Sequence, residues 1–217
     1  MQAQENPTTF HDIDTVVFDL GGVVIDLRRE NAVEALIGLG LKDADEMLDT
    51  YCQTGPFLLL ETGKLTAGEF FDTIRRATGN PAVTDAEIEE AFNRFLVSLP
   101  VERLRALREL RARGKRVLAL SNTNPIMYHS WIARHFRSEG LTVNDYFDGI
   151  VTSFQEGVCK PDALIFKRLI DRYSLDPART LFLDDGEANC HAARLCGLQA
   201  AHVTPQDTML QIVSRIE

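Results

Sequence analysis

The strongest indication of the fold class is the segment Thr15-Val16-Val17-Phe18-Asp19-Leu20-Gly21-Gly22-Val23. Its first four residues are apolar or β-branched, which predicts a short strand buried on both faces, as in a parallel sheet. Asp19 and the two glycines end that strand. Because Val23-Val24-Ile25 is again β-prone, we expect a small hairpin or flap to follow.

Further along the chain, short apolar runs alternate with helical patterns. This alternation predicts βαβ units joined by right-handed crossovers. The expected fold is therefore α/β, with a Rossmann-like parallel sheet flanked by helices. The expected strands are Val117 to Leu120, Gly149 to Thr152, Leu181 to Leu183 and Gln199 to Val203, and the expected helices are Val101 to Arg113, one opened by Asn124-Pro125, one from Lys160-Pro161 to Tyr173, Glu187 to Cys196, and one opened by Thr204-Pro205.

The region from Leu27 to Pro100 has a helical pattern and no β-rich run. Thr66 with Glu69, and Thr84 with Glu87, both have the spacing of a capping box. Apolar residues follow each box at helical spacing, with Phe92, Phe95 and Leu96 on the second helix. We therefore expect two parts: an α/β core made of residues 1–26 and 101–217, and an inserted α-helical unit made of residues 27–100.

Composition excludes several classes of protein. The 217 residues carry a formal net charge of −9, which argues against an extended nucleic-acid surface but leaves room for a small phosphorylated ligand. No run of 18 apolar residues occurs and the N-terminus lacks a signal-peptide pattern, so neither a membrane span nor secretion is expected. The cysteines form no CxxC pair, which disfavours a disulfide scaffold and makes a reducing cytoplasm the default location. They are Cys52, Cys159, Cys190 and Cys196.

Polar side chains follow three of the predicted strands. They are Asp19, Ser121 and the pair Asp184-Asp185. Any one of them is also typical of a residue that caps the next helix or turn. Together, on neighbouring strands, they would place three carboxylates at one edge of the sheet, where their mutual repulsion requires a cation.

Lys160 is a candidate for that cation. It stands just before Pro161, where the N-cap of a helix is expected, and lysine is a poor N-cap. A lysine that points to solvent is the alternative. Nucleotide-binding and serine-hydrolase motifs are absent: the sequence has no GxGxxG after a strand, no GxxxxGK[ST] and no GxSxG.

Four segments resemble, in order, motifs I to IV of the haloacid dehalogenase-like hydrolases. The helical insert matches the position of that family's cap, and the wording of the motifs is most similar to a bacterial branch that includes alpha-D-glucose-1-phosphate phosphatases. The four segments are Asp19-Leu20-Gly21-Gly22-Val23, Leu120-Ser121-Asn122-Thr123-Asn124, Lys160-Pro161-Asp162, and Asp184-Asp185 through Asn189.

The resemblance implies a phosphatase mechanism with an aspartyl-phosphate intermediate. Asp19 would be the nucleophile. Mg²⁺ would be held by the Asp19 carboxylate, the Gly21 carbonyl and Asp185. Asp184 would support Lys160 or a metal-bound water. Ser121 and the backbone N–H of Asn122 would bind phosphoryl oxygens, and Lys160 would neutralise developing charge.

One position departs from the family pattern. Most phosphatases of the family carry a second Asp two residues after the nucleophile, as general acid and base, and Gly21 stands there in this chain. Loss of a general acid costs on the order of 10²–10⁴-fold in rate. The substrate would then have a good leaving group, or another residue or the substrate would move the proton, or the protein would bind phosphorylated ligands without efficient turnover.

Three functions follow as hypotheses. The leading one is a Mg²⁺-dependent phosphatase of a small phosphorylated metabolite such as a sugar phosphate. The second is a metal-free 2-haloacid dehalogenase, which the Asp184-Asp185 pair disfavours because it adds negative charge. The third is a non-catalytic metabolite-binding or regulatory protein, while the vacant acid position disfavours a phosphomutase. Gly55-Pro56-Phe57 and Glu61-Thr62-Gly63-Lys64 are candidates for facing the site from the insert.

Overall fold

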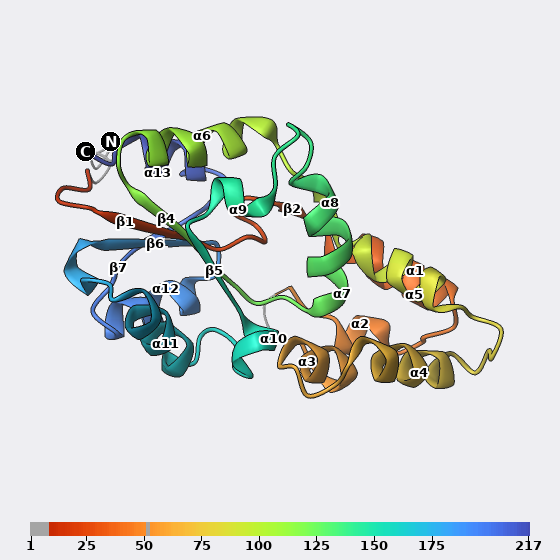
Figure 1. Cartoon of the computed structure of the whole chain (residues 1–217). Helices are drawn as coiled ribbons and strands as arrows, with labels where there is room; N and C mark the ends of the chain where they lie inside the picture. Colours follow the sequence, from red (N-terminus) through yellow and green to blue (C-terminus); the bar gives the residue numbers. More distant parts are fainter. Residues whose placement is uncertain (1–8, 51–52) are drawn as a thin grey trace, which may run out of the picture.

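A computed structural model describes residues 9–50 and 53–217. Its centre is a five-stranded, all-parallel sheet with the strand order β5-β4-β1-β6-β7 (Figure 1). This confirms the α/β class predicted from the alternation of apolar runs and helices. The strands are β1 (Thr15–Phe18), β4 (Arg116–Ser121), β5 (Gly149–Thr152), β6 (Thr180–Asp184) and β7 (Gln199–His202).

Helices cover both faces of the sheet, since its side chains alternate between two apolar clusters. Val16 and Phe18 belong to one cluster, and Val17 belongs to the other. The first face is covered by α6 and α13, and the second by α11 and α12 (Figure 1). The core helices are α6 (Val101–Ala112), α7 (Pro125–Met127), a π-helical turn (Tyr128–Ile132), α8 (Ala133–His135), α9 (Val143–Tyr146), α10 (Ser153–Glu156), α11 (Ala163–Tyr173), α12 (Glu187–Leu195) and α13 (Met209–Ser214), with a 3-10 turn at Pro177–Arg179.

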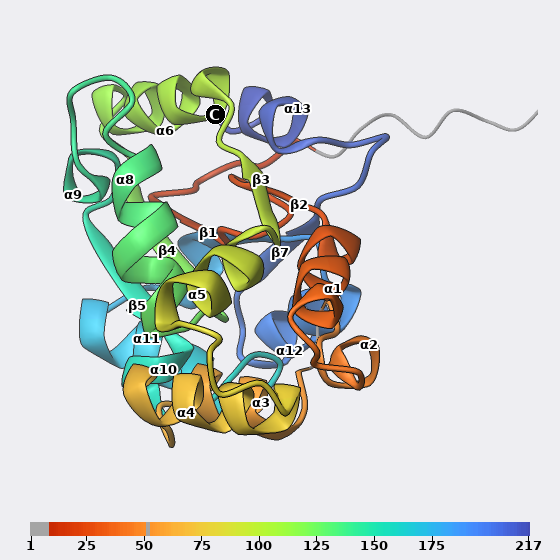
Figure 2. The same cartoon turned by 90° about the vertical axis from the view of Figure 1, so that its right-hand side faces the viewer.

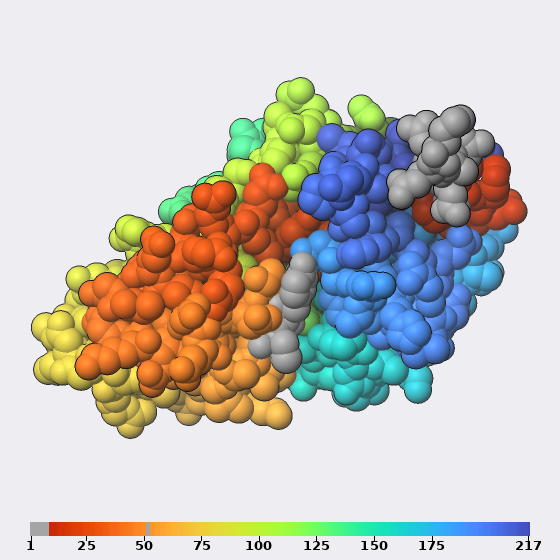
Figure 3. All heavy atoms as spheres, turned by 180° about the vertical axis from the view of Figure 1, so that it is seen from behind, coloured from red at the N-terminus to blue at the C-terminus, as the bar shows by residue number. Residues whose placement is uncertain are grey.

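Beyond the carboxyl ends of the strands, the described residues between 29 and 93 form five helices, which make up a helical insert, residues 29–93 (Figure 1). Its interior contains an aromatic group in which the ring of Phe57 lies 5.3 Å from that of Phe70 and 5.1 Å from that of Phe92. Seen from behind, the insert and the core occupy opposite ends of the molecule (Figure 3). The helices are α1 (Arg29–Gly38), α2 (Ala44–Met47), α3 (Gly55–Glu61), α4 (Ala67–Thr78) and α5 (Asp85–Asn93).

The chain enters and leaves the insert through two short strands, β2 (Asp26–Leu27) and β3 (Leu96–Ser98), which pair antiparallel (Figure 2). The prediction that the region from Leu27 to Pro100 has no strand was therefore wrong at its two ends. The helix α5 ends at Asn93, so Leu96 lies in β3 and not on that helix. Strands of two and three residues are too short to show a period of two, and their partners are 72 residues apart, as the Ser98–Asp26 side-chain hydrogen bond shows.

The N-caps of three helices test the capping signals predicted from the sequence. Both predicted capping boxes form, with Thr66 and Thr84 as N-caps. The prediction that Thr204-Pro205 starts the last helix was wrong: α13 begins at Met209 with Thr208 as its N-cap. Thr204 instead closes a turn, because its hydroxyl oxygen accepts a hydrogen bond from the backbone N–H of Asp207.

Two further expectations concern cysteines and membranes. Cys159, Cys190 and Cys196 are free thiols, whereas Cys52 lies outside the described residues. Within residues 9–50 and 53–217, no helix is long and apolar enough to cross a bilayer.

Candidate active site

Three carboxylates meet at the carboxyl edge of the sheet, as the sequence predicted. Asp19 follows the central strand β1, and Asp184 and Asp185 follow or end the neighbouring strand β6, with Phe18 in register with Leu183. One carboxylate oxygen from each of the three lies within 4.8 Å of the others. The order β5-β4-β1-β6-β7 makes β1 the point where the chain changes direction across the sheet, which is where open α/β folds bind ligands.

Lys160 lies inside this cluster and is only 2 % exposed. Its Nζ lies 2.9 Å from Asp19 Oδ1, 2.7 Å from Asp184 Oδ2 and 3.0 Å from the Leu120 carbonyl oxygen. Three acceptors use all three protons of an ammonium group. The N-cap of α11 is Asp162, whose side chain accepts from the N–H of Leu164, so Lys160 is free of any capping role.

Burial and charge set the ionisation of this pair. Burial raises the pKa of Asp19 to about 8; the Lys160 cation opposes this shift, and the charges of Asp184 and Asp185 add to it. The pKa of Lys160 is also raised, because the attraction of the two carboxylates outweighs its burial. One fixed cation among three carboxylates leaves the site short of positive charge, and this oxygen-rich donor set fits Mg²⁺.

Asp184 differs from Asp185 in its surroundings. Asp184 is fully buried, and its second oxygen accepts from the Gly186 N–H at 2.7 Å and from Asn189 Nδ2 at 2.8 Å. With both oxygens hydrogen-bonded, Asp184 is a fixed support for Lys160. Asp185 lines the cavity described below.

The end of β4 contributes the second wall of the site. Ser121 is buried and lines the cavity. The Asn122 side chain is engaged elsewhere: its Nδ2 donates to the Lys160 carbonyl at 2.9 Å, and its Oδ1 accepts from the Lys160 N–H at 2.8 Å. The following turn is fixed by Ser153, whose hydroxyl accepts from Thr123 N–H and donates to Thr123 O. These hydrogen bonds join the end of β4, which carries Ser121, to the segment that carries Lys160.

The two glycines after the nucleophile position have different surroundings. Gly22 has a φ of +72°, and a Cβ there would stand 2.1 Å from Asp185 Oδ2, so only glycine allows Asp185 its place. A Cβ at Gly21 would stand 2.9 Å from Leu27 Cδ1. Leu27 therefore occupies the space beside the position where a second aspartate would begin.

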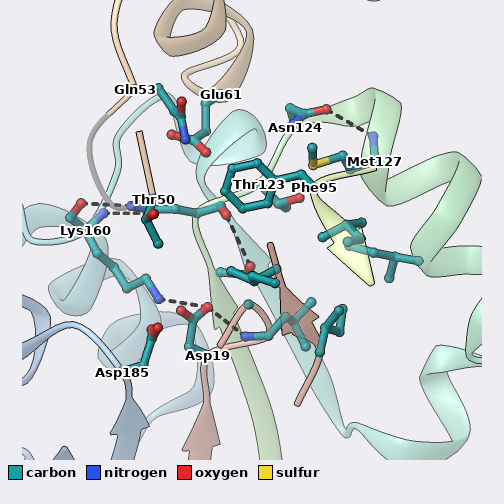
Figure 4. A pocket seen from close by; sticks show the side chains of 18 of the residues that line it. Asp19, Thr50, Gln53, Glu61, Phe95, Thr123, Asn124, Met127, Lys160 and Asp185 are labelled. Carbon is teal, nitrogen blue, oxygen red and sulfur yellow. Dashed lines mark hydrogen bonds and ion pairs between the residues drawn. The ribbon is translucent and has the colours of Figure 1, made fainter. Parts of the chain in front are cut away.

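The carboxylates open into a cavity of about 80 Å³ between the sheet edge and the insert. An adjoining groove of about 530 Å³ shares part of its lining, including Gln53, Glu61 and Lys160. In Figure 4, Glu61 and Gln53 lie across the cavity from Asp19 and Asp185. Apolar side chains close another side of the cavity; they include Phe92, Phe95, Leu96, Met127 and Ile132.

Comparison with known proteins assigns the family. Residues 13–197 match the family model of the haloacid dehalogenase-like hydrolases. The chain belongs to this family. The match covers β1 through α12, and so includes all four motif segments and the insert.

Relatives of this hydrolase include named phosphatases. A D-ribitol-5-phosphate phosphatase from Bacteroides thetaiotaomicron is 40% identical over 187 residues, covering 86% of this chain and 90% of the relative. A glyceraldehyde 3-phosphate phosphatase from Pyrococcus abyssi is 28% identical, covering 80% of this chain and 73% of the relative. A solved enzyme of the family from B. thetaiotaomicron, in complex with magnesium and inorganic phosphate, superposes with a TM-score of 0.82 at 35% identity, covering 88% of this chain and 94% of the other.

The sequence of this hydrolase did not indicate the positions of two side chains at the site. The Asn122 amide clamps the Lys160 backbone, a contact between segments 38 residues apart. Gln53 lines both the cavity and the groove although it lies in an irregular stretch. Of the two insert segments that the sequence offers as candidates for facing the site, one contributes Glu61 to the cavity. In the other, Phe57 lies in the aromatic interior of the insert.

Proposed function

We propose that this hydrolase is a Mg²⁺-dependent phosphatase of a small sugar or polyol phosphate, acting through an aspartyl-phosphate on Asp19. The observation that carries the proposal is the three-carboxylate cluster around a fully hydrogen-bonded Lys160 at the sheet edge. Two relatives with phosphorylated sugar or polyol substrates support the substrate class. The alpha-D-glucose-1-phosphate branch stays a prediction.

Asp19 is the nucleophile in this proposal. The Leu20 N–H, at 2.7 Å, and the Lys160 ammonium both donate to its Oδ1. Among the described residues, no donor reaches Oδ2, and we assign the attack on phosphorus to that oxygen. The fixed Oδ1 holds the carboxylate plane in one orientation, which lowers the entropic cost of reaching the transition state.

The remaining residues bind and neutralise the phosphoryl group. Ser121 and the Asn122 N–H donate to phosphoryl oxygens, and Lys160 stabilises negative charge on the nucleophile side. Asp19, Asp185 and the Gly21 carbonyl would hold Mg²⁺, with Asp184 supporting Lys160. When bound, Mg²⁺ supplies the positive charge that lets an anionic carboxylate approach a phosphate dianion. The helical insert, residues 29–93, acts as the cap that excludes water from the cavity.

A phosphate-release assay tests the proposal. The purified protein is assayed against p-nitrophenyl phosphate, ribitol 5-phosphate, glyceraldehyde 3-phosphate and glucose 1-phosphate, with Mg²⁺ and with EDTA. We expect Mg²⁺-dependent turnover, and a loss on the order of 10⁴-fold or more in Asp19→Asn. Full activity of Asp19→Asn would refute the nucleophile assignment.

Adding 2-chloropropionate and a thermal-shift measurement to this panel separates the other hypotheses. Chloride release from 2-chloropropionate without Mg²⁺ would identify a dehalogenase. Thermal stabilisation by the phosphorylated compounds, with no phosphate release from any of them, would identify a binding protein.

A further inference from the structure

Hydrolysis of an alkyl phosphate needs a proton donor that Gly21 does not provide. The attacking and leaving oxygens lie roughly in line across phosphorus. With Asp19 on the sheet side, the leaving oxygen faces the insert. A primary alkoxide is a strongly basic leaving group, so an acid must stand on that side of the cavity.

Four titratable side chains of the described chain line the cavity: Asp19, Glu61, Lys160 and Asp185. Asp19 is the nucleophile, and Lys160 holds its proton because two carboxylates and a carbonyl surround it. Asp185 lies beside Asp19, on the wrong side for the leaving oxygen (Figure 4). Glu61 is the remaining acid, and it lies across the cavity from Asp19 (Figure 4).

The place of Glu61 is fixed by the contact of the insert with the core. Glu61 is the last residue of α3. Two residues later, Gly63 has a φ of +63°, and a Cβ there would stand 2.2 Å from the Phe154 carbonyl oxygen in α10. The turn after α3 therefore lies directly on the core backbone. The Cys159 thiol lies 3.8 Å from Glu61 Oε2 and 3.9 Å from the Glu61 carbonyl oxygen, as a weak donor.

Because of its surroundings, the Glu61 carboxyl group is protonated in part of the molecules and ionised in the rest near neutral pH. Burial raises the pKa of Glu61 to about 7, against the opposing attraction of the Lys160 cation. The titratable groups that face it are Cys159 and Lys160 before α11, and Asp19 and Asp185 across the cavity. Along the groove that Glu61 also lines, Glu187 and His202 complete this set among the described residues. Burial raises the pKa of the Cys159 thiol to about 12, so that neighbour stays neutral. A carboxyl group with this pKa is suited to general acid and base catalysis.

We propose that Glu61 is the general acid and base of the reaction. It takes the role of the aspartate that most phosphatases of the family carry at the position of Gly21. In the first step Asp19 bonds to phosphorus, the bond from phosphorus to the leaving oxygen breaks, and that oxygen takes the Glu61 proton, giving an alcohol and a Glu61 carboxylate. In the second step the carboxylate takes a proton from water, whose oxygen attacks phosphorus and releases phosphate from Asp19. This assignment rests on the proposed phosphatase function.

Two substrates with different leaving groups test the assignment. Glu61→Gln keeps the shape of the side chain but has no acidic proton. With ribitol 5-phosphate, whose leaving group is an alkoxide, we expect kcat/KM to fall on the order of 10²–10³-fold. With p-nitrophenyl phosphate, whose phenolate needs little protonation, we expect a fall of less than about 5-fold in kcat/KM. Equal losses on both substrates would assign Glu61 a structural role and overturn the proposal.

Controls keep the outcome interpretable. Glu34→Gln, on the exposed side of α1, should leave kcat/KM unchanged for both substrates. If Glu61→Gln does not fold, as a thermal melt would show, the wild-type pH profile decides. There kcat/KM for ribitol 5-phosphate should fall as pH rises through about 7, since the acid must be protonated, with a weaker fall for p-nitrophenyl phosphate. Identical profiles contradict the assignment, whereas absence of wild-type turnover on both substrates contradicts the phosphatase function itself.

Discussion

On the sheet side of the cavity, Lys160 Nζ has three oxygen acceptors within 3.0 Å, whereas on the insert side the Glu61 carboxyl has, among the described residues, one thiol partner at 3.8 Å. The first environment fixes a charge, because every proton of the ammonium is used. The second leaves a carboxyl group whose protonation can change. The two walls thus have different roles in the proposed reaction. The sheet side fixes the charged groups Lys160, Asp19 and Asp184 in place, and the insert side supplies Glu61 as the proton donor and acceptor.

The largest effect is expected at Lys160. Lys160→Met fills similar space but leaves Asp19 and Asp184 buried without their cation. Breaking a buried ion pair in this way costs about 3–5 kcal/mol of unfolding free energy. We therefore expect that loss in urea unfolding, together with a fall in kcat of at least about 10³-fold. Wild-type stability in this variant would show that the sheet wall does not depend on the fixed charge.

A double variant sharpens this result. In Lys160→Met/Asp184→Asn one of the two unpaired carboxylates becomes neutral. If the cost of Lys160→Met comes from uncompensated charge, part of the lost stability should return while activity stays low. The effects of substitutions at contacting residues on the free energy of unfolding are not additive. Further destabilisation, equal to the sum of the single changes, would favour lost packing as the cause.

Gly22 gives the next largest effect. Gly22→Ala forces a side chain into a left-handed backbone, at a cost of about 1–2 kcal/mol, and also against Asp185 Oδ2 at 2.1 Å. We expect Mg²⁺-dependent kcat/KM to fall on the order of 10²-fold, since the added carbon displaces Asp185, a carboxylate proposed to hold the metal. Gly79→Ala is the matched control: its φ is +68° and nothing lies within 4 Å of the added carbon. It should lose only the stability that the left-handed backbone costs and keep full activity. Equal activity in the two variants would contradict the role of Gly22.

Gly63 tests the insert wall in the same way. Gly63→Ala adds a Cβ 2.2 Å from the Phe154 carbonyl oxygen and should push the turn after α3 away from the core. Because Glu61 precedes this turn, we expect kcat/KM for ribitol 5-phosphate to fall by roughly 10-fold, since small displacements of a catalytic group have large effects on rate. Gly79→Ala again controls for the backbone cost. A Gly63→Ala variant as active as Gly79→Ala would show that this contact does not position Glu61.

The sequence predicted the sheet wall better than the insert wall, for physical reasons. Asp19, Ser121 and Asp184 end buried strands, and parallel strands bring their carboxyl ends together whatever the loops do. Lys160 was identified because it is a poor N-cap, and it proved to be an ion-pair partner. The insert wall depends on how its helices pack on the core. The hydrophobic periodicity of the sequence predicts helices but not their packing. Contacts such as Asn122 with Lys160, or Gly63 with Phe154, join distant segments and are visible only in three dimensions.

The smallest effect is expected at the surface of the insert, far from either wall. Thr84→Ala removes the N-cap of α5, whose hydroxyl accepts from the Glu87 N–H and donates to Glu87 Oε2. Loss of such a cap should lower Tm by about 2–4 °C. The apolar core runs continuously from the sheet into the insert, with Phe18 and Ile88 in one cluster, so we expect a single melting transition and unchanged kcat. Two transitions in calorimetry would show that the insert unfolds on its own, and the two walls of the cavity would then belong to units that are energetically separate.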